Sequence, residues 1–245
     1  MNKTILRTNA IQVYSFLSFL NAKQKKGELN KPLKILDCDA GGAVHPLALF
    51  AEYGFETCGI DISDEQLEKA KQYYSEHNLK ADFIKADMRQ IPFENDSFDC
   101  VYEHYSMCHL SKRDTAKTVN EMYRVTKKNG YAFLGFISTN CWPKSAYGVE
   151  KNPGEFWTEQ DGKFYMHNMF TENKTDQLVA DWKIIYKQKH TKYMREDANK
   201  LSKKEWLNLY DKVNEEYSKN EWMRHYECRT NLCIFSHIFY ILKKL

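Results

Sequence analysis

Between residues 34 and 137, the hydrophobic and polar positions follow two patterns that take turns along the chain. Short apolar runs typical of buried strands occupy Lys34–Cys38, Glu56–Asp61, Ala81–Lys85, Phe98–Tyr102 and Tyr131–Ile137. Between these runs, apolar residues such as Leu67, Ala70 and Tyr74 recur every three or four positions, which predicts helices with one buried face. Strands that alternate with helices predict an α/β fold with a doubly wound, mostly parallel sheet.

The segments outside this region complete the predicted architecture. A short, interrupted apolar stretch predicts an N-terminal helix within about residues 1–30. Two further strands bring the predicted sheet to seven, at Trp182–Lys187 and Leu232–Leu242. Proline, glycine and aromatic residues predict a cap at about 139–171, and a second cap insertion with a charged helix near Lys203–Trp222 is expected at about 190–228. We therefore expect residues 1–245 to form a single domain.

Composition and charge narrow the class of protein without identifying an activity. Hydrophobic residues make up 42% of the chain and charged residues 28%, as in ordinary globular proteins. The 36 basic and 33 acidic residues are well mixed, so the chain has no basic footprint for nucleic acid. The N-terminal apolar stretch is too short and too polar for a membrane span. Seven cysteines without a CxxC pair predict reduced thiols in a cytoplasmic protein, and no pattern specifies an oligomeric state.

The first predicted strand leads into a turn of small residues, CDAGG (38–42), which a helix follows. Such a turn brings backbone amides against a ligand. Asp61 ends the second strand twenty residues after Gly41, where a carboxylate can accept hydrogen bonds from both hydroxyls of a ribose. Ser63 and Gln66 form a capping box that begins the next helix. Each feature alone also fits a structural turn or a helix cap, but together they predict a cleft for a nucleoside cofactor.

The segments ILDCDAGG (35–42) and GIDIS (59–63) resemble the first two motifs of class I S-adenosyl-L-methionine (SAM)-dependent methyltransferases. Three later segments fall in the same order as in that family, namely KADM (85–88), SFDCVYEH (97–104) and EMYRVTKKNG (121–130). The resemblance covers roughly residues 33–138. It implies a Rossmann-like methyltransferase fold and SAM as the cofactor.

The resemblance also implies roles for individual residues. Asp87 would hold the adenine amino group, and the Met88 amide would bind a ring nitrogen. Glu103 and His104 would border the transfer site, and His104 is our candidate base because an imidazole of near-neutral pKa there could take a proton from the acceptor. The expected cofactor-binding residues are Asp37, Cys38, Asp39, Ala40, Gly41, Asp61, Ile62, Gln66, Asp87, Met88 and Glu103. The expected acceptor contacts are the cap residues Tyr147, Trp157 and His167.

The turn departs from the family pattern at two positions. The family usually places glycine where this chain has Asp39 and Ala43, which leaves Gly41 as the one match in the three-glycine spacing. A side chain at position 39 narrows the space for the methionine tail of the cofactor and adds a negative charge. Alternatively, the carboxylate could pair with the α-ammonium of the cofactor through a charge-assisted hydrogen bond. Both outcomes stay open from the sequence.

We expect methyl transfer from SAM to an O, N or S atom of a small-molecule acceptor held beneath the cap. Positioning two reactants in a dry cleft supplies most of the acceleration in such a transfer, so no catalytic triad is expected. No second ligand pair accompanies His104, Cys108 and His109, so no metal is expected. Two alternatives stay open: a SAM-binding protein of the same fold with weak or lost catalysis, and an NAD(P)-dependent oxidoreductase.

Overall fold

The computed structural model describes residues 11–30, 32–42, 46–141, 144–160, 162–193 and 234–245. The described helices are α1 (Ile11–Lys25), α2 (Leu47–Glu52), α3 (Asp64–Glu76), α4 (Lys112–Val125) and α5 (Glu172–Leu178), with short 3-10 turns η2 (Met107–His109) and η3 (Lys144–Tyr147). The described strands are β1 (Lys34–Asp37), β2 (Glu56–Asp61), β3 (Asp82–Lys85), β4 (Phe98–Tyr102), β5 (Thr126–Ile137), β6 (Val149–Asn152), β7 (Glu155–Gln160), β8 (Lys163–Asn168), β9 (Lys183–Tyr193) and β10 (Ile234–Lys243). The predicted helix at Lys203–Trp222, most of the second cap insertion and Ala43 lie outside the described residues.

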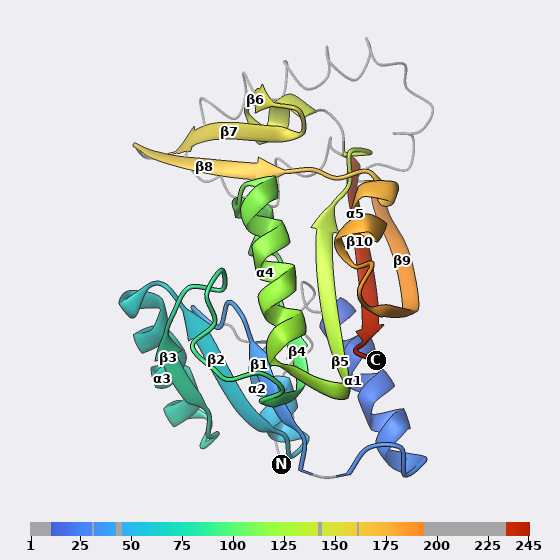
Figure 1. Cartoon of the computed structure of the whole chain (residues 1–245). Helices are drawn as coiled ribbons and strands as arrows, with labels where there is room; N and C mark the ends of the chain where they lie inside the picture. Colours follow the sequence, from blue (N-terminus) through green and yellow to red (C-terminus); the bar gives the residue numbers. More distant parts are fainter. Residues whose placement is uncertain (1–10, 31, 43–45, 142–143, 161, 194–233) are drawn as a thin grey trace.

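Seven strands form one sheet in the order β3-β2-β1-β4-β5-β10-β9 (Figure 1). Strands β1 to β5 pair in parallel, and β10 runs antiparallel to both β5 and β9. The strand order reverses between β1 and β4, and open α/β sheets bind ligands at the carboxyl ends of the strands on either side of such a reversal. The predicted doubly wound, mostly parallel seven-stranded α/β sheet is therefore confirmed.

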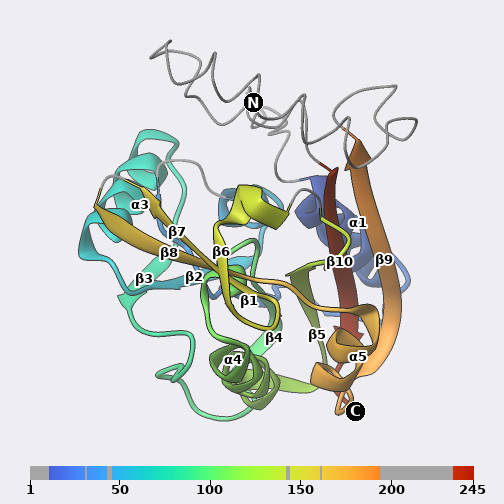
Figure 2. The ribbon, with the colours of Figure 1, turned by 90° about the horizontal axis from the view of Figure 1, so that it is seen from above.

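Hydrophobic side chains cover both faces of the sheet because successive residues of a buried strand point to opposite sides. Ile35 packs with α1 and α2 on one face, whereas Leu36 packs with α4 on the other. Figure 2 shows α1 and α4 on opposite sides of the sheet. Helix α1 buries a stripe of apolar side chains at helical spacing, namely Val13, Phe16, Leu17 and Leu20. None of the described helices is long and apolar enough to cross a membrane.

Two strand boundaries differ from the sequence prediction by more than two residues. Strand β5 begins at Thr126 rather than at Tyr131, and the turn at 128–130 lies within it as an irregularity. There the register with β4 shifts, and Asn129 has a φ of 66°. Strand β9 continues to Tyr193, beyond the predicted end at Lys187, because β10 pairs along its whole length. Both differences come from pairing between distant segments, which a local pattern does not encode.

The cap contains regular strands. Strands β6, β7 and β8 form a separate antiparallel sheet, which lies across the carboxyl ends of the parallel strands (Figures 1 and 2). The sequence predicts an aromatic-rich cap in this region but not its strands, because such short segments show no strict alternation of polar and apolar residues. The cap is thus a folded layer above the edge where a ligand would bind.

Two side chains attach this cap to the N-terminal end of α4. The amide of Asn168 donates hydrogen bonds to the carbonyls of Met107 (3.1 Å) and Leu110 (2.7 Å) and to the Thr115 hydroxyl (2.8 Å). Glu155 accepts a hydrogen bond from the Lys112 backbone N–H (2.7 Å), at the end of the helix where a negative charge is favourable. Since Asn168 is buried, its donors have no water to replace these partners.

Replacing Asn168 with Asp should destabilise the protein, because a carboxylate would face two carbonyl oxygens and donate to neither. We expect the free energy of unfolding to fall by about 1–3 kcal/mol, measured by urea denaturation. The matched control is Asn30→Asp, the same change at an exposed position. Equal unfolding midpoints for the two variants would contradict the anchoring role of Asn168.

Candidate functional site

Three carboxylates come together at the carboxyl ends of the central strands. Asp37 ends β1, Asp61 ends β2, and Glu103 follows the last residue of β4. Parallel strands end at the same edge of a sheet, so these residues and the turn at 38–42 lie where the strand order reverses. The charges of Asp61 and Glu103 both act on Asp37. The structure thus brings together residues that the sequence assigns to one cofactor cleft.

The turn after β1 is held between the two neighbouring strands. The Cys38 N–H donates to the carbonyl of Tyr102 in β4 (3.0 Å), and the Ala40 N–H donates to a β2 carbonyl (2.9 Å). Asp37 is buried, and its carboxylate accepts hydrogen bonds from the Asp39 N–H (3.0 Å) and the Tyr102 hydroxyl. Burial raises the pKa of Asp37 to about 7. The backbone of the turn is therefore positioned by the protein itself.

Gly41 lies directly against the end of β2. A Cβ atom at this position would lie 2.0 Å from Asp61 Oδ2 and 2.7 Å from Gln66 Cβ, which leaves no room for a side chain. Asp61 Oδ1 accepts a hydrogen bond from the Ser63 N–H (2.7 Å), and Ser63 Oγ caps α3 by accepting one from the Gln66 N–H (3.3 Å). The Gly42 N–H donates to the Gln66 carbonyl (3.1 Å). Gly41 and the α3 cap together fix the position of the Asp61 carboxylate.

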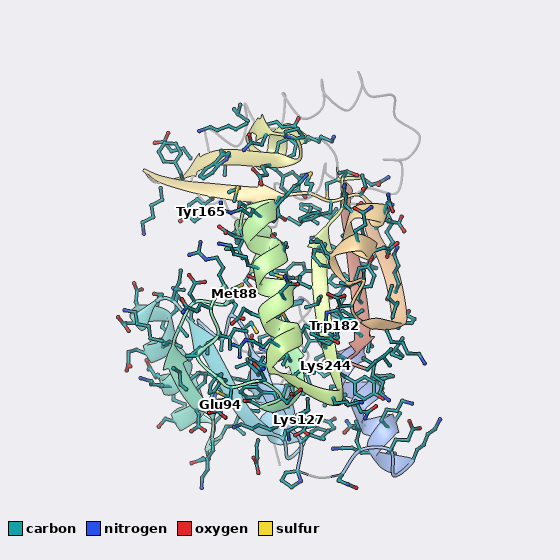
Figure 3. All side chains as sticks on the ribbon, in the orientation of Figure 1. Met88, Glu94, Lys127, Tyr165, Trp182 and Lys244 are labelled. Carbon is teal, nitrogen blue, oxygen red and sulfur yellow. The ribbon has the colours of Figure 1, made fainter. Side chains whose placement is uncertain are left out.

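Two features near the ends of β2 and β3 could contact a ligand, namely the exposed side chain of Ile62 and the backbone N–H of Met88. Ile62, directly after Asp61, exposes 67% of its surface despite being apolar. Met88 lies beside α4, on the β3 side of the sheet, with its side chain buried (Figure 3). Among the described residues, none accepts a hydrogen bond from the Met88 backbone N–H. Both features are suited to a planar ring with a hydrogen-bond acceptor on its edge.

Asp87 has the expected place after β3 and is bound by a neighbour that the sequence does not single out. The Arg89 guanidinium donates to both carboxylate oxygens of Asp87 at distances of 2.6 to 3.0 Å, and to Asp114 at 3.2 Å. Hydrogen bonds from Arg89 lower the pKa of Asp87, so this carboxylate is ionised at neutral pH. Arg89 belongs to no motif, so only its contacts in the fold assign it a role.

Glu103 is fully buried, and donors of the protein occupy its carboxylate. Oε2 accepts hydrogen bonds from the Ser106 N–H (3.1 Å), the Ser106 hydroxyl (3.1 Å) and the Met107 N–H (3.0 Å). Oε1 accepts one from the Gly135 N–H (3.0 Å). Burial raises the pKa of Glu103, while these hydrogen bonds act in the opposite direction. The sequence assigns Glu103 to the cofactor, but in the structure its side chain joins the loop after β4 to β5.

The rings of His104 and His237 lie next to the ring of Tyr105. His104 and Tyr105 follow β4, and His237 lies in β10, where it pairs with Ile137 at the end of β5. The Tyr105 ring centroid lies 4.1 Å from that of His104 and 5.0 Å from that of His237. The φ of Tyr105 is 71°, a left-handed conformation that is uncommon outside glycine and that often marks functional sites. His104 Nε2 is buried without a hydrogen-bond partner in the described part of the chain.

Burial, together with the neighbouring His237, lowers the pKa of His104 to about 4. The imidazole is therefore neutral at pH 7 and can accept a hydrogen bond through an unprotonated nitrogen. The expected near-neutral pKa of His104 is therefore wrong. The sequence shows the place of His104 after the strand, but it does not show the protein that packs around the ring.

Of the three expected acceptor contacts, two lie together. Tyr147 is buried, and its ring centroid lies 5.5 Å from that of His167, which in turn lies 4.9 Å from that of His109. Trp157 pairs with Met166, the neighbour of His167 in β8. Since successive strand residues alternate between faces, Trp157 and His167 lie on opposite faces of the cap sheet. Tyr147 and His167 thus lie together, and Trp157 lies apart from them.

Residues 36–134 match the family model described as a methyltransferase domain. This span runs from β1 into β5 and contains the turn, Asp61 and Asp87. The chain carries a class I SAM-dependent methyltransferase domain. SAM is therefore the cofactor of this domain, and the match favours methyl transfer over the nicotinamide alternative.

Sequence relatives of the methyltransferase domain are found in fungi and bacteria. Sterol 24-C-methyltransferase of Saccharomyces cerevisiae is 32% identical over 127 residues, which span 48% of this chain and 32% of the relative. The uncharacterized methyltransferase YcgJ of Bacillus subtilis is 33% identical over 111 residues, spanning 45% of this chain and 43% of the relative. In these sequence matches, the chain thus spans about a third of the length of the sterol methyltransferase and less than half of YcgJ.

Solved structures of methyltransferases share the fold over most of the chain. A SAM-dependent methyltransferase from Methanosarcina mazei has a TM-score of 0.65 at 18% identity, covering 91% of this chain and 97% of that one. The structure of YcgJ from Bacillus subtilis has a TM-score of 0.58 at 18% identity, covering 93% of this chain and 98% of that one. The fold similarity therefore extends well beyond the part matched by the family model.

Gly41→Ala should lower the affinity for SAM. The new Cβ would overlap Asp61 Oδ2, so the carboxylate must leave the position that Ser63 and the turn give it. We expect a loss of affinity of about tenfold or more in isothermal titration, the cost of one charged hydrogen bond. Ala180→Ser adds one heavy atom at an exposed residue and serves as control. Native affinity in Gly41→Ala would mean that SAM does not depend on this contact.

His104 should remain neutral across the physiological pH range. We expect its ring protons in an NMR titration to show no protonation between pH 8 and pH 5.5, because the pKa of His104 is lowered to about 4. Comparison with the spectrum of His104→Phe assigns the resonance. A midpoint near pH 6.5 would show that water reaches the ring and would restore the role of an ordinary base.

Proposed function

We propose that this chain binds SAM at the carboxyl ends of β1, β2 and β4 and transfers its methyl group to an O, N or S atom of a small molecule. The observation that carries the proposal is the close packing of Gly41 against Asp61, inside the span that matches the methyltransferase domain. The close contact with the glycine backbone fixes the Asp61 carboxylate, and a fixed carboxylate at this strand end can accept hydrogen bonds from the two hydroxyls of a ribose.

The nucleoside half of the cofactor has suitable partners nearby. The exposed side chain of Ile62 offers an apolar face for the adenine ring. The Met88 N–H is available to a ring nitrogen, and ionised Asp87, oriented by Arg89, has lone pairs for the adenine amino group. The cofactor-binding residues of this proposal are therefore Asp61, Ile62, Asp87 and Met88, with Asp37, Cys38, Ala40, Gly41 and Gln66 shaping the turn.

When bound, SAM supplies an electrophilic methyl group on a positively charged sulfur. The contribution of the protein is to hold the two reactants in line and to exclude water, which supplies most of the acceleration in such a displacement. Glu103 acts as a positioning residue, because its four internal hydrogen bonds keep the loop after β4 attached to β5.

For the acceptor, we propose a place between the loop after β4, which carries His104 and Tyr105, and the cap residues Tyr147 and His167. The lowered pKa values of His104 and His167, each about 4 because of burial, make both imidazoles neutral hydrogen-bond partners at pH 7. Neutral, partly aromatic surroundings favour an uncharged acceptor with an O–H or N–H group that donates to the His104 ring.

The yeast relative is named for methylation of a sterol at carbon 24. The chain spans only about a third of that relative, so the name does not decide the acceptor here. The cap of this chain, with its own three-stranded sheet, is the basis for proposing a small-molecule acceptor.

Two broader features belong to the same proposal. Helix α1 packs on the sheet and the cap is anchored to α4, which supports one domain over residues 1–245. The described cysteines are free thiols, which supports a reducing, cytoplasmic location. A SAM-binding protein without catalysis is the second candidate, favoured by the side chain that Asp39 adds where the family has glycine.

Asp61→Asn should weaken SAM binding by about ten- to a hundredfold, because an amide replaces a charged acceptor for two ribose hydroxyls. Isothermal titration measures the change. Asp64→Asn, in the next turn of the chain, is the matched control, since Asp64 only forms an exposed ion pair with Lys85. If the native protein fails to bind SAM at high micromolar concentration, the proposed function is abandoned; equal affinity in Asp61→Asn would move the cofactor elsewhere.

A further inference from the structure

Asp39 stands at the start of the turn, between the ends of β1 and β4. Its N–H is held by Asp37 Oδ1 (3.0 Å), while its side chain is exposed to solvent. The carboxyl group lies within hydrogen-bonding reach of the Ser106 side chain, on the β4 side of the turn. The Asp39 carboxyl group therefore lies beside Ser106, in the loop that follows β4.

The surroundings of Asp39 are strongly acidic. The partly enclosing protein and the charges of Asp37, Asp61 and Glu103 raise the pKa of Asp39. Among the described residues, no lysine or arginine is one of the charged groups that shift the pKa values of Asp37, Asp39 and Glu103 most. The cluster lacks a positive partner of its own.

The described residues around Asp39 do not form a metal-binding group. In the described part of the chain, no group of three or more His, Cys, Asp or Glu side chains is arranged to hold one. Asp37 and Glu103 are buried and already accept hydrogen bonds from the protein, so Asp39 is the carboxylate of this group that remains open toward a ligand at the β4 side. An organic cation bound beside Asp39 would supply a positive charge to this group.

We propose that Asp39 is a specificity-determining residue that binds the α-ammonium group of the methionine tail of SAM. This inference rests on the proposed function and assigns a partner to the residue at which the turn departs from the family. An ammonium group offers three N–H donors to a carboxylate, whereas a sulfonium carries a charge but no donor. The carboxylate thus replaces, by a charge-assisted hydrogen bond, the close backbone approach that a glycine at position 39 allows.

An ammonium contact at Asp39 affects only the affinity of ligands that carry the amino-acid tail. SAM and its product S-adenosylhomocysteine share the ammonium group, and methylthioadenosine has the same nucleoside but no amino-acid tail. Removing the charge of Asp39 must therefore weaken the first two ligands alike and leave the third unchanged. A contact with the sulfonium would instead affect SAM alone, because the product lacks that charge.

The test is isothermal titration of the native protein, Asp39→Asn and Asp39→Gly with these three ligands, with Asp64→Asn as the control for an exposed aspartate. We expect Asp39→Asn to bind SAM and S-adenosylhomocysteine about tenfold or more weakly, with equal losses, and to bind methylthioadenosine like the native protein. Asp39→Gly should also lose affinity for the two tailed ligands.

Three results would overturn the inference while leaving SAM binding intact. Native or tighter SAM binding in Asp39→Asn or Asp39→Gly would mean that the carboxylate hinders the tail. A loss for SAM alone would assign Asp39 to the sulfonium. A matching loss for methylthioadenosine would mean that the substitution disturbs the turn as a whole. Failure of the native protein to bind any of the three ligands would instead remove the proposed function, and this inference with it.

Discussion

The turn after β1 is held in place from both sides, and the site depends on that constraint. Cys38 and Ala40 donate their N–H groups to β4 and β2, and buried Asp37 binds the backbone of the turn and the hydroxyl of Tyr102. These bonds bring Gly41 against Asp61, at a distance that excludes any side chain. The sheet order provides the setting, since β1 lies between β2 and β4 where the strand order reverses.

The same arrangement concentrates negative charge. Parallel strands deliver Asp37, Asp61 and Glu103 to one edge, and the turn adds Asp39. The protein compensates two of these groups internally: Asp37 by hydrogen bonds within the turn, and Glu103 by the donors around η2 and β5. Asp61 is buried beside the exposed Ile62, and Asp39 is exposed on the β4 side of the turn. A ligand with ribose hydroxyls and a positively charged tail complements both.

The cap lies across the carboxyl ends of the parallel strands, opposite the turn after β1. Asn168 and Glu155 attach it to the loop and helix that follow β4, so the cap and the transfer site share one support. This common attachment gives a physical reason for the grouping of Tyr147 and His167 near His109, in the loop after β4. It also explains the neutral histidines of the site, because packing of the cap and β10 removes water from their rings.

Four features could be predicted from the amino-acid sequence: the α/β class, the order of the central strands along the chain, the helix start at Ser63 and the pairing of a glycine turn with Asp61. These features are local, because periodicity, helix caps and small-residue turns depend on residues close together in the sequence. Tertiary structure alone decided that Glu103 faces inward, that Arg89 holds Asp87, that Trp157 lies on the far face of the cap, and that the pKa of His104 is low. Each of these depends on strand register or on burial by distant segments, which no local pattern records. For the turn itself, the sequence specified an unusual carboxylate at position 39, and only the fold placed it beside Ser106, in the loop after β4.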